Sequence, residues 1–214
     1  MKQLIAFLVV IATSAAYCQT PSGVEKPAVK VGDRWIYSQV DLLTNLVIQT
    51  STIEVLAVEG DTIRTRNTLA NRTPTEDNST TEDNIFDSQW NARHADGRTF
   101  KPVRPFYSFP LDVGKTWEGR LSYPNQKGDS QINSQMKGTV VGRESVTVPA
   151  GTFQTLRIVI TGSYYSERAF GKRGGGGVGK WTIWYAPEVK RHVKLEYEEG
   201  RNQTRSELTE YKVN

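Results

Sequence analysis

The stretch Val146-Thr147-Val148-Pro149-Ala150-Gly151-Thr152-Phe153, followed shortly by Leu156-Arg157-Ile158, decides the fold class of this chain. The residues on either side of its proline and glycine are mostly β-branched or aromatic, as pleated strands prefer. Pro149 suits the second position of a β-turn and Gly151 the fourth, so residues 148–151 are a type I turn candidate. The stretch therefore predicts two strands joined by a tight turn.

Strands are also indicated downstream, where Trp181-Thr182-Ile183-Trp184-Tyr185-Ala186-Pro187 ends in a second turn. Side chains of a strand alternate between its two faces, which assigns three predicted apolar faces. They are Leu156, Ile158 and Ile160; then Trp181, Ile183 and Tyr185; then Val193, Leu195 and Tyr197. Arg157 is expected to reach solvent, and His192 is expected to point outward with Lys194 and Glu196.

Alternation of this kind continues through most of the chain, whereas helical periodicity is nearly absent. The predicted strands cover residues 34–38, 46–55, 62–69, 84–90, 116–123, 131–143, 153–168, 180–185, 191–197 and 204–211. About ten strands with short connections predict an all-β antiparallel meander. A sheet of that length must curl to cover its apolar face, so we expect a curved, partly open barrel.

The N-terminus has the pattern of a secretory leader: Lys2 precedes an apolar run over residues 4–12, and small residues follow. Cleavage after Ala16 and cleavage after Cys18 both fit. The predicted organisation is a signal peptide over residues 1–18, a flexible linker over 19–30 and one β domain over 31–214. Export, to a bacterial periplasm, is the expected localisation, and no transmembrane segment is expected in the mature chain.

Cys18 is the only cysteine. A lipid-attachment site prefers an aliphatic residue three places before the cysteine and a small one directly before it, but Ala15 and Tyr17 stand there. Lipid anchoring is therefore not expected, nor is an internal disulfide in the mature chain. The net charge of +4 is small and scattered, which argues against nucleic acid as a partner.

Three segments interrupt the strand pattern. Residues 71–84 repeat Thr-Glu-Asp-Asn and are predicted to be a polar loop rather than a calcium site. Residues 91–114 hold three prolines among aromatic residues, so we predict a non-strand segment that packs over the sheet as a lid. Residues 174–180 read G-x-x-x-x-G-K, but Trp181 replaces the hydroxyl residue of a phosphate-binding loop and a strand follows, so a flexible hairpin loop is predicted.

Few residues could support catalysis. His94 lies beside Asp96 in a predicted loop, and the sequence contains no recognised nucleophile or zinc motif. A loop-assembled hydrolase would require His94, Asp96 and Arg93 or Arg98 to converge with a carboxylate. The sequence predicts no catalytic residues, no metal and no cofactor, and the chain is expected not to be an enzyme.

The Val-x-Val-Pro-Ala-Gly-Thr-Phe element, the Trp-Tyr-Ala-Pro turn and Val113-Gly114-Lys115-Thr116-Trp117 occur in an order that resembles the TapB-like family of exported bacterial proteins. The resemblance covers most of residues 30–211. Many members continue the turn with Gly-Val-Gly, whereas this chain has Glu188-Val189-Lys190. The resemblance implies a curved, partly open β-barrel, loosely similar to lipoprotein carriers, and implies no accepted activity.

The leading functional hypothesis is a non-enzymatic binding protein that holds a lipid or other apolar ligand on the concave face of the sheet. Its candidate ligand-binding residues are Trp35, Trp117, Trp181, Trp184, Phe106 and Phe109. The alternative is an envelope subunit that docks a protein partner. Whether the interior of the barrel is hollow separates a binding protein from one whose aromatic residues only fill the core.

Overall fold

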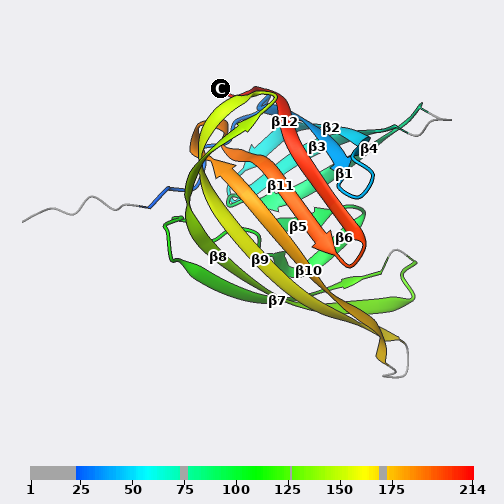
Figure 1. The fold of residues 1–214 in the computed structure, drawn as a ribbon. Coiled ribbons are helices and arrows are strands. Elements are labelled where there is room, and N and C mark those ends of the chain that lie inside the picture. The colour runs from blue at the N-terminus through cyan, green and yellow to red at the C-terminus, as the bar shows by residue number, and fades with distance from the viewer. Residues whose placement is uncertain (1–22, 73–76, 126, 169–172) are drawn as a thin grey trace, which may run out of the picture.

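Twelve strands form a closed antiparallel barrel in the computed structural model, which describes residues 23–72, 77–125, 127–168 and 173–214 (Figure 1). The predicted leader, with Cys18, lies outside the described residues. The strands are β1 (Arg34–Asp41), β2 (Leu46–Glu59), β3 (Thr62–Arg72), β4 (Asp77–Asp87), β5 (Ala92–Ala95), β6 (Arg98–Arg104), β7 (Thr116–Pro124), β8 (Ser130–Val148), β9 (Gly151–Arg168), β10 (Arg173–Ala186), β11 (Arg191–Glu199) and β12 (Asn202–Lys212). A 3-10 turn, η2 (Pro187–Val189), joins β10 to β11.

Each strand pairs with its neighbours in sequence, as the predicted meander requires, and β1 also pairs with β12 from Arg34–Lys212 to Asp41–Thr204. The expected partly open barrel is therefore wrong, because the last strand returns to the first and leaves no free edge. The hairpin at Pro149-Ala150 is present, since Val148 pairs with Gly151.

The prediction of about ten strands missed β5 and β6, which lie inside the supposed lid. β5 has only 4 residues, and β6 contains Pro102, which lacks a backbone N–H to donate. Proline is tolerated here because β6 and β7 share few backbone hydrogen bonds: the pairing between these strands consists of Lys101 and Ser122. After β6, residues 105–115 do pack against the barrel, and Tyr107 and Leu111 are buried.

The polar loop predicted over residues 71–84 is also wrong in large part, because β3 and β4 extend through its described portion. Their register runs from Thr62–Asp87 to Arg72–Asp77. Polar cross-strand contacts replace apolar ones, such as the ion pair between Arg66 and Asp83 at 3.1 Å. Threonine and asparagine are held in this strand by the β3 ladder, since only Ile85 and Phe86 of β4 pair with β5.

One end of the barrel is closed by contacts between distant parts of the sequence. Trp35 Nε1 donates to the carbonyl of Val189 at 2.9 Å, and Trp90 Nε1 donates to that of Lys190 at 2.9 Å. Tyr107, Phe109 and Tyr185 pack ring against ring beside them. Within the predicted linker, Val24 forms an isolated antiparallel bridge with Leu111.

The other end is the open mouth. Because the strands alternate in direction, the hairpins β1–β2, β7–β8, β9–β10 and β11–β12 all turn at this end. Strands β8 and β9, with 19 and 18 residues, are the longest, and with β7 and β10 they sweep past the rest of the barrel as a curved wall (Figure 1). The closed end and this long wall position the site described next.

Candidate functional site

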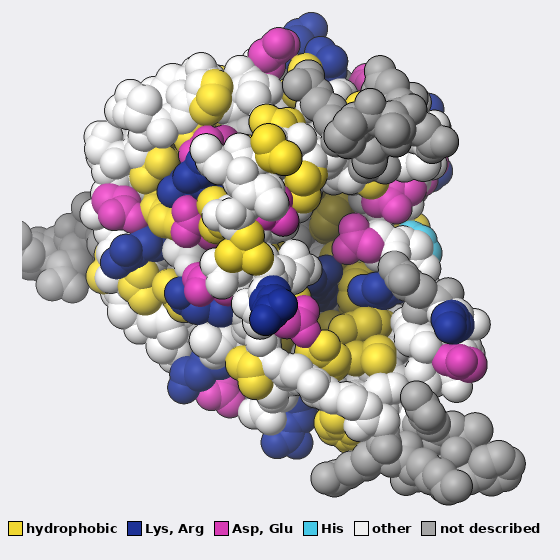
Figure 2. Space-filling view, turned by 45° about the vertical axis from the view of Figure 1, so that its right-hand side comes forward, with side chains coloured by type: hydrophobic (Ala, Val, Ile, Leu, Met, Phe, Trp, Pro, Cys, Tyr) yellow, Lys and Arg dark blue, Asp and Glu magenta, His cyan; other side chains and the backbone are white. Residues whose placement is uncertain are grey.

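A chamber of about 1000 Å³ opens at the mouth, inside the wall formed by β7 to β10. We call it the large chamber. Figure 2 looks onto a hollow in which hydrophobic side chains lie beside basic ones. Apolar residues that line the large chamber are Leu121, Ile132, Met136 and Trp181, and polar or charged ones include Arg98, Arg104, Tyr123, Tyr164, Tyr197 and Glu199. The interior of the barrel is therefore hollow on this side.

Glycines of β10 create part of this space. The segment predicted as a flexible hairpin loop is instead paired strand, with Gly176 opposite Tyr165 and Gly179 opposite Gly162. A Cβ atom on Gly179 would lie 3.1 Å from the Trp181 ring and 3.2 Å from the Tyr197 ring. The loop prediction is wrong because these glycines serve close packing: the aromatic rings lie flat over strand backbone that carries no side chain.

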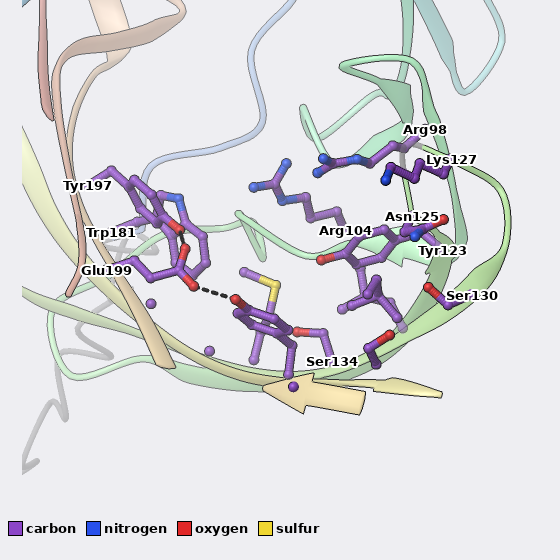
Figure 3. A pocket seen from close by; sticks show the side chains of 18 of the residues that line it. Arg98, Arg104, Tyr123, Asn125, Lys127, Ser130, Ser134, Trp181, Tyr197 and Glu199 are labelled. Carbon is purple, nitrogen blue, oxygen red and sulfur yellow. Dashed lines mark hydrogen bonds between the residues drawn. The ribbon is translucent and has the colours of Figure 1, made fainter. Parts of the chain in front are cut away.

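Glu199 is held on one side of the large chamber by two phenols (Figure 3). Tyr164 donates its hydroxyl hydrogen to Glu199 Oε1, and Tyr197 donates to Oε2. The bond to Glu199 raises the pKa of Tyr164 to about 12, with burial adding to it. Burial, together with the bond to Glu199, raises the pKa of Tyr197. Both phenols are therefore neutral donors over the physiological range, and Glu199 is fixed in place.

Basic side chains lie across the chamber from Glu199, where Figure 3 shows Arg98, Arg104 and Lys127. The Arg104 guanidinium lies 4.6 Å from the Phe106 ring centroid and 5.7 Å from that of Trp181. It also pairs with Asp96 at 3.6 Å. Burial lowers the pKa of Arg104, and the Asp96 carboxylate opposes that shift. Cation–π contacts of this kind offset part of the cost of burying the charge.

A second cavity of about 180 Å³, the small chamber, lies on the β2 to β6 side and shares Arg104 with the large one. Its other lining residues include Thr65, Asn67, Asn84, Phe86, Trp90, Phe106, Arg191 and His192. The prediction that His192 points outward is wrong. β10 pairs Trp184 with Lys194 but Tyr185 with His192, so a β-bulge at Val193 interrupts the alternation.

His192 stacks on Tyr37 inside the barrel, with ring centroids 4.8 Å apart. Burial lowers the pKa of His192 well below its usual value, and neighbouring Arg191 lowers it further. The imidazole is therefore neutral near neutral pH. Burial raises the pKa of Tyr37 as well. Neither ring contributes charge to the small chamber.

The six predicted ligand-binding residues do not gather at one site. Trp181 lines the large chamber and Phe106 the small one, and their ring centroids are 5.8 Å apart. Trp35, at 0% exposure, belongs to the packed core. Phe109 stacks on Tyr107 in the closed end. The structure thus brings two of the six residues to a cavity.

Trp117 and Trp184 fill other positions. Trp117 lies against Gly138 and donates from Nε1 to the carbonyl of Pro105 at 3.0 Å. Trp184 is on the outer face of the barrel, where it donates to Glu144 and where Lys194 Nζ lies 4.4 Å from its ring centroid. It therefore cannot contact a ligand held on the concave face.

The residues of the hydrolase hypothesis diverge. His94 Nδ1 and Thr99 Oγ1 are 3.0 Å apart across the β5–β6 hairpin. Arg93 pairs with Asp61 at 2.8 Å, whereas Asp96 pairs with Arg104. In the part of the chain that the structure describes, no group of three or more His, Cys, Asp or Glu side chains is placed to hold a metal ion.

The fold is similar to that of a proposed lipoprotein from Parabacteroides distasonis, with a TM-score of 0.58 over 89% of this chain and 99% of that one, at 16% sequence identity. A proposed exported protein with a YmcC-like fold from Bacteroides fragilis follows at a TM-score of 0.48 and 13% identity, covering 89% and 99% of the two chains. The hypothetical lipoprotein YmcC from Escherichia coli gives a TM-score of 0.40 and 9% identity, covering 86% of each chain. At 16% identity the first similarity shows the fold alone.

No family model matches the sequence, and no curated protein matches it. The resemblance to the TapB-like family is therefore not confirmed, and the first structural similarity supports only a barrel of this type. Among the described residues, no helix has the length and apolar character needed to cross a membrane.

Sequence reasoning missed the charged residues of both chambers, chiefly Arg104, Arg191 and Glu199. Arg104 ends the unpredicted strand β6, and Arg191 begins a strand whose bulge the sequence does not reveal. Glu199 is the last residue of β11, two residues beyond the end of the strand predicted over 191–197. A usable signal was present in the tyrosines: Tyr197 is two residues before Glu199, so the two side chains share a face.

Proposed function

We propose that this protein is an exported, non-enzymatic barrel whose large chamber binds a lipid or a similar molecule with a hydrocarbon tail. The observation that carries the proposal is the hollow of about 1000 Å³ inside a closed barrel. In eight-stranded barrels side chains can fill the interior, but the interior widens as strands are added. Small-molecule sites in proteins typically occupy about 300–1,000 Å³, so the large chamber is at the upper end of that range.

The lining of the large chamber favours a ligand with both a hydrocarbon tail and a polar group over a pure hydrocarbon. Trp181, Met136 and Leu121 offer apolar surface, while the guanidinium group of Arg104 and the carboxyl group of Glu199 lie at the edge of the same space. An amphiphile places each of its parts against a matching surface.

Exposed apolar side chains beside the mouth give further support. The tip of the β1–β2 hairpin exposes Leu43 at 60% and Leu46 at 64%, with Val47 and Ile48 next to them. The Leu42 N–H donates to the carbonyl of Gln203, which ties this tip to the β11–β12 hairpin that carries Glu199. An apolar tip at the mouth is suited to contact with a membrane from which a lipid is taken.

The test is a chamber-filling variant with a matched control. Ile132→Trp adds a large side chain inside the large chamber, whereas Ser145→Trp adds the same side chain on the exposed face of the same strand. We expect Ile132→Trp to weaken binding of dodecanol by about tenfold or more, and Ser145→Trp to leave it within twofold. Native mass spectrometry of protein isolated from its bacterium should show bound amphiphile that the filled variant lacks.

Equal binding by both variants, or a bare mass in every preparation together with no dodecanol binding, would overturn the proposal. The same exposed hairpin tip favours a second candidate function, docking to an envelope protein. In that case a partner would co-purify with the Ile132→Trp variant as well, and would be lost when Leu43 and Leu46 are both changed to Ser.

A further inference from the structure

The small chamber contains a buried cation, Arg191, the first residue of β11. Its side chain turns inward directly after Lys190, which has a left-handed backbone with φ of 62°. The residue is 8% exposed. Its guanidinium carbon lies 4.3 Å from the Trp90 ring centroid, 5.5 Å from that of Trp35 and 5.6 Å from that of Phe86. Arg191 is thus enclosed by three aromatic rings.

Its charge has no counter-ion within the described part of the chain. The ion pairs of that part do not include Arg191, and its Nε and Nη1 atoms lack hydrogen-bond partners. Asp96, the carboxylate of the small chamber, is paired with Arg104. A buried charge without a counter-ion is strongly unfavourable, and the cation–π contacts and a hydrogen bond with Tyr37 offset only part of that cost, so Arg191 is poorly explained as a structural residue.

Other polar atoms beside Arg191 are also unsatisfied. Thr65 Oγ1, Asn67 Oδ1 and Asn84 Oδ1 are buried in the lining of the small chamber without partners. The orientation of Asn84 is set by its Nδ2 atom, which donates to Glu82 at 3.3 Å. Buried polar groups in native proteins are normally paired, so a cluster of unpaired ones around a cavity indicates that something else pairs with them.

The cavity is large enough to supply that partner. Its volume of about 180 Å³ corresponds to about six water molecules at about 30 Å³ each, which is room for a carboxylate or phosphate with accompanying water. Anions with planar or tetrahedral oxygens are the groups that guanidinium binds best. Hydroxyls or water bound to such an anion would donate to Asn67 and Asn84.

We propose that the small chamber binds the anionic head, a carboxylate or a phosphate, of the amphiphile whose apolar chain occupies the large chamber. Arg104 lines both chambers, and Phe106 of the small chamber packs against Trp181 of the large one, so head and chain sites adjoin. The placement of the ligand's hydrocarbon tail in the large chamber rests on the proposed function, whereas the anion site rests on Arg191 itself.

Arg191→Met separates a binding role from a structural one. Methionine has a similar length and packs against the same rings without a charge, so the melting temperature should stay the same or rise, as when buried charges are replaced by apolar residues. Lys180→Met is the control, because it also removes one positive charge but from an exposed pair with Glu198 on the outer face. Arg191→Gln serves as a second variant if Arg191→Met does not fold.

Binding of dodecanoate, dodecyl phosphate, dodecanol and hexanoate is measured by calorimetry on wild type and variants. We expect one or both anions to bind wild type and Lys180→Met about tenfold or more tightly than dodecanol, since a charge-assisted hydrogen bond contributes about that factor. The advantage should vanish in Arg191→Met, while dodecanol binding stays within twofold. The relative affinities of dodecanoate and dodecyl phosphate identify the head group.

Equal affinities of wild type for dodecanol and both anions would overturn the anion site and leave the proposed function standing. A lower melting temperature of Arg191→Met with unchanged selectivity would also overturn it, since Arg191 would then be structural. Hexanoate binding that depends on Arg191, without any dodecanol binding, would retain the anion site and remove the proposed function. Failure of all four ligands would overturn both.

Discussion

At the scale of single residues, the mouth of the barrel combines opposite charges that are each held in place differently. Glu199 accepts hydrogen bonds from Tyr164 and Tyr197, so its position is set by two rings on β9 and β11, the strands on either side of β10. Arg104 is set by aromatic faces and by Asp96. Side chains fixed in this way keep their orientation when no ligand is bound, so less conformational entropy is lost when a ligand binds.

Glu199→Gln tests this arrangement. An amide oxygen still accepts the bond from Tyr164 but carries no charge, so the pKa of Tyr164 should fall from about 12 towards its ordinary value of about 10. In wild type the protonated phenol stabilises the fold fully below about pH 10, and that contribution is lost as the pH rises through about 12. Absorbance titration of tyrosinate measures the shift. Glu198→Gln, whose partner is Lys180 on the outer face, should leave the titration unchanged.

The sequence predicts only some of the side chains that line a cavity. Alternation correctly grouped Trp181 with Ile183 and Tyr185, and the same rule puts Trp184 on the opposite face. The structure agrees, because Trp184 lies against Glu144 and Lys194 on the outside. Its inclusion among the ligand-binding candidates therefore followed residue type rather than position. His192 is different, since the bulge that turns it inward has no signature in the sequence.

At the scale of elements, glycines in the long strands decide where large rings can lie. Trp117 is paired with Gly138 across β7 and β8, and its ring covers the glycine. A Cβ atom on Gly138 would come within 2.2 Å of that ring. The ring is also anchored through Nε1 to Pro105, so it cannot simply swing away. Glycine in these strands is thus a packing requirement rather than a mark of a loop.

Gly138→Ala should accordingly destabilise the protein by about 1–3 kcal/mol, the range for forcing a group into a packed site. Gly142→Ala is the matched control in the same strand, because a Cβ atom there meets nothing within 4 Å. It should change stability by less than about 0.5 kcal/mol. Urea unfolding followed by tryptophan fluorescence measures both. Equal effects of the two substitutions would contradict the role assigned to Trp117.

Strand predictions were accurate where alternation is long and apolar, as in β9 and β11, and failed where polar residues, glycine or proline occupy strands. β4 reads as loop sequence because its ladder with β3, rather than apolar side chains, keeps residues 77–84 extended, and only Ile85 and Phe86 pair with β5. The similar segments Val31-Gly32-Asp33-Arg34-Trp35 and Val113-Gly114-Lys115-Thr116-Trp117 form the same kind of turn. Gly32 and Gly114 each donate to a valine carbonyl of a neighbouring strand, Val55 and Val140, at 2.9 Å.

At the scale of the whole molecule, closure of the barrel depends on contacts that join its first and last strands. Asp33, at 0% exposure, directly precedes β1. Its Oδ1 accepts from the backbone N–H of Asn214 at 2.8 Å, and its Oδ2 pairs with Lys190 Nζ at 3.0 Å. Lys190 in turn donates to the carbonyl of Asn214 at 2.7 Å. One buried carboxylate thus joins the start of β1, the end of β12 and the β10–β11 connection.

Asp33→Ala should destabilise the fold by about 3–5 kcal/mol, the cost of removing one partner of a buried ion pair, since Lys190 would lose its counter-ion and the Asn214 N–H would lose its acceptor. Asp83→Ala removes an exposed partner of Arg66 and should cost less than about 1 kcal/mol. Hydrogen exchange locates the effect: in Asp33→Ala, protection should fall first along the β1–β12 ladder. If protection falls uniformly through the sheet, Asp33 contributes to global stability but does not act as the closing contact.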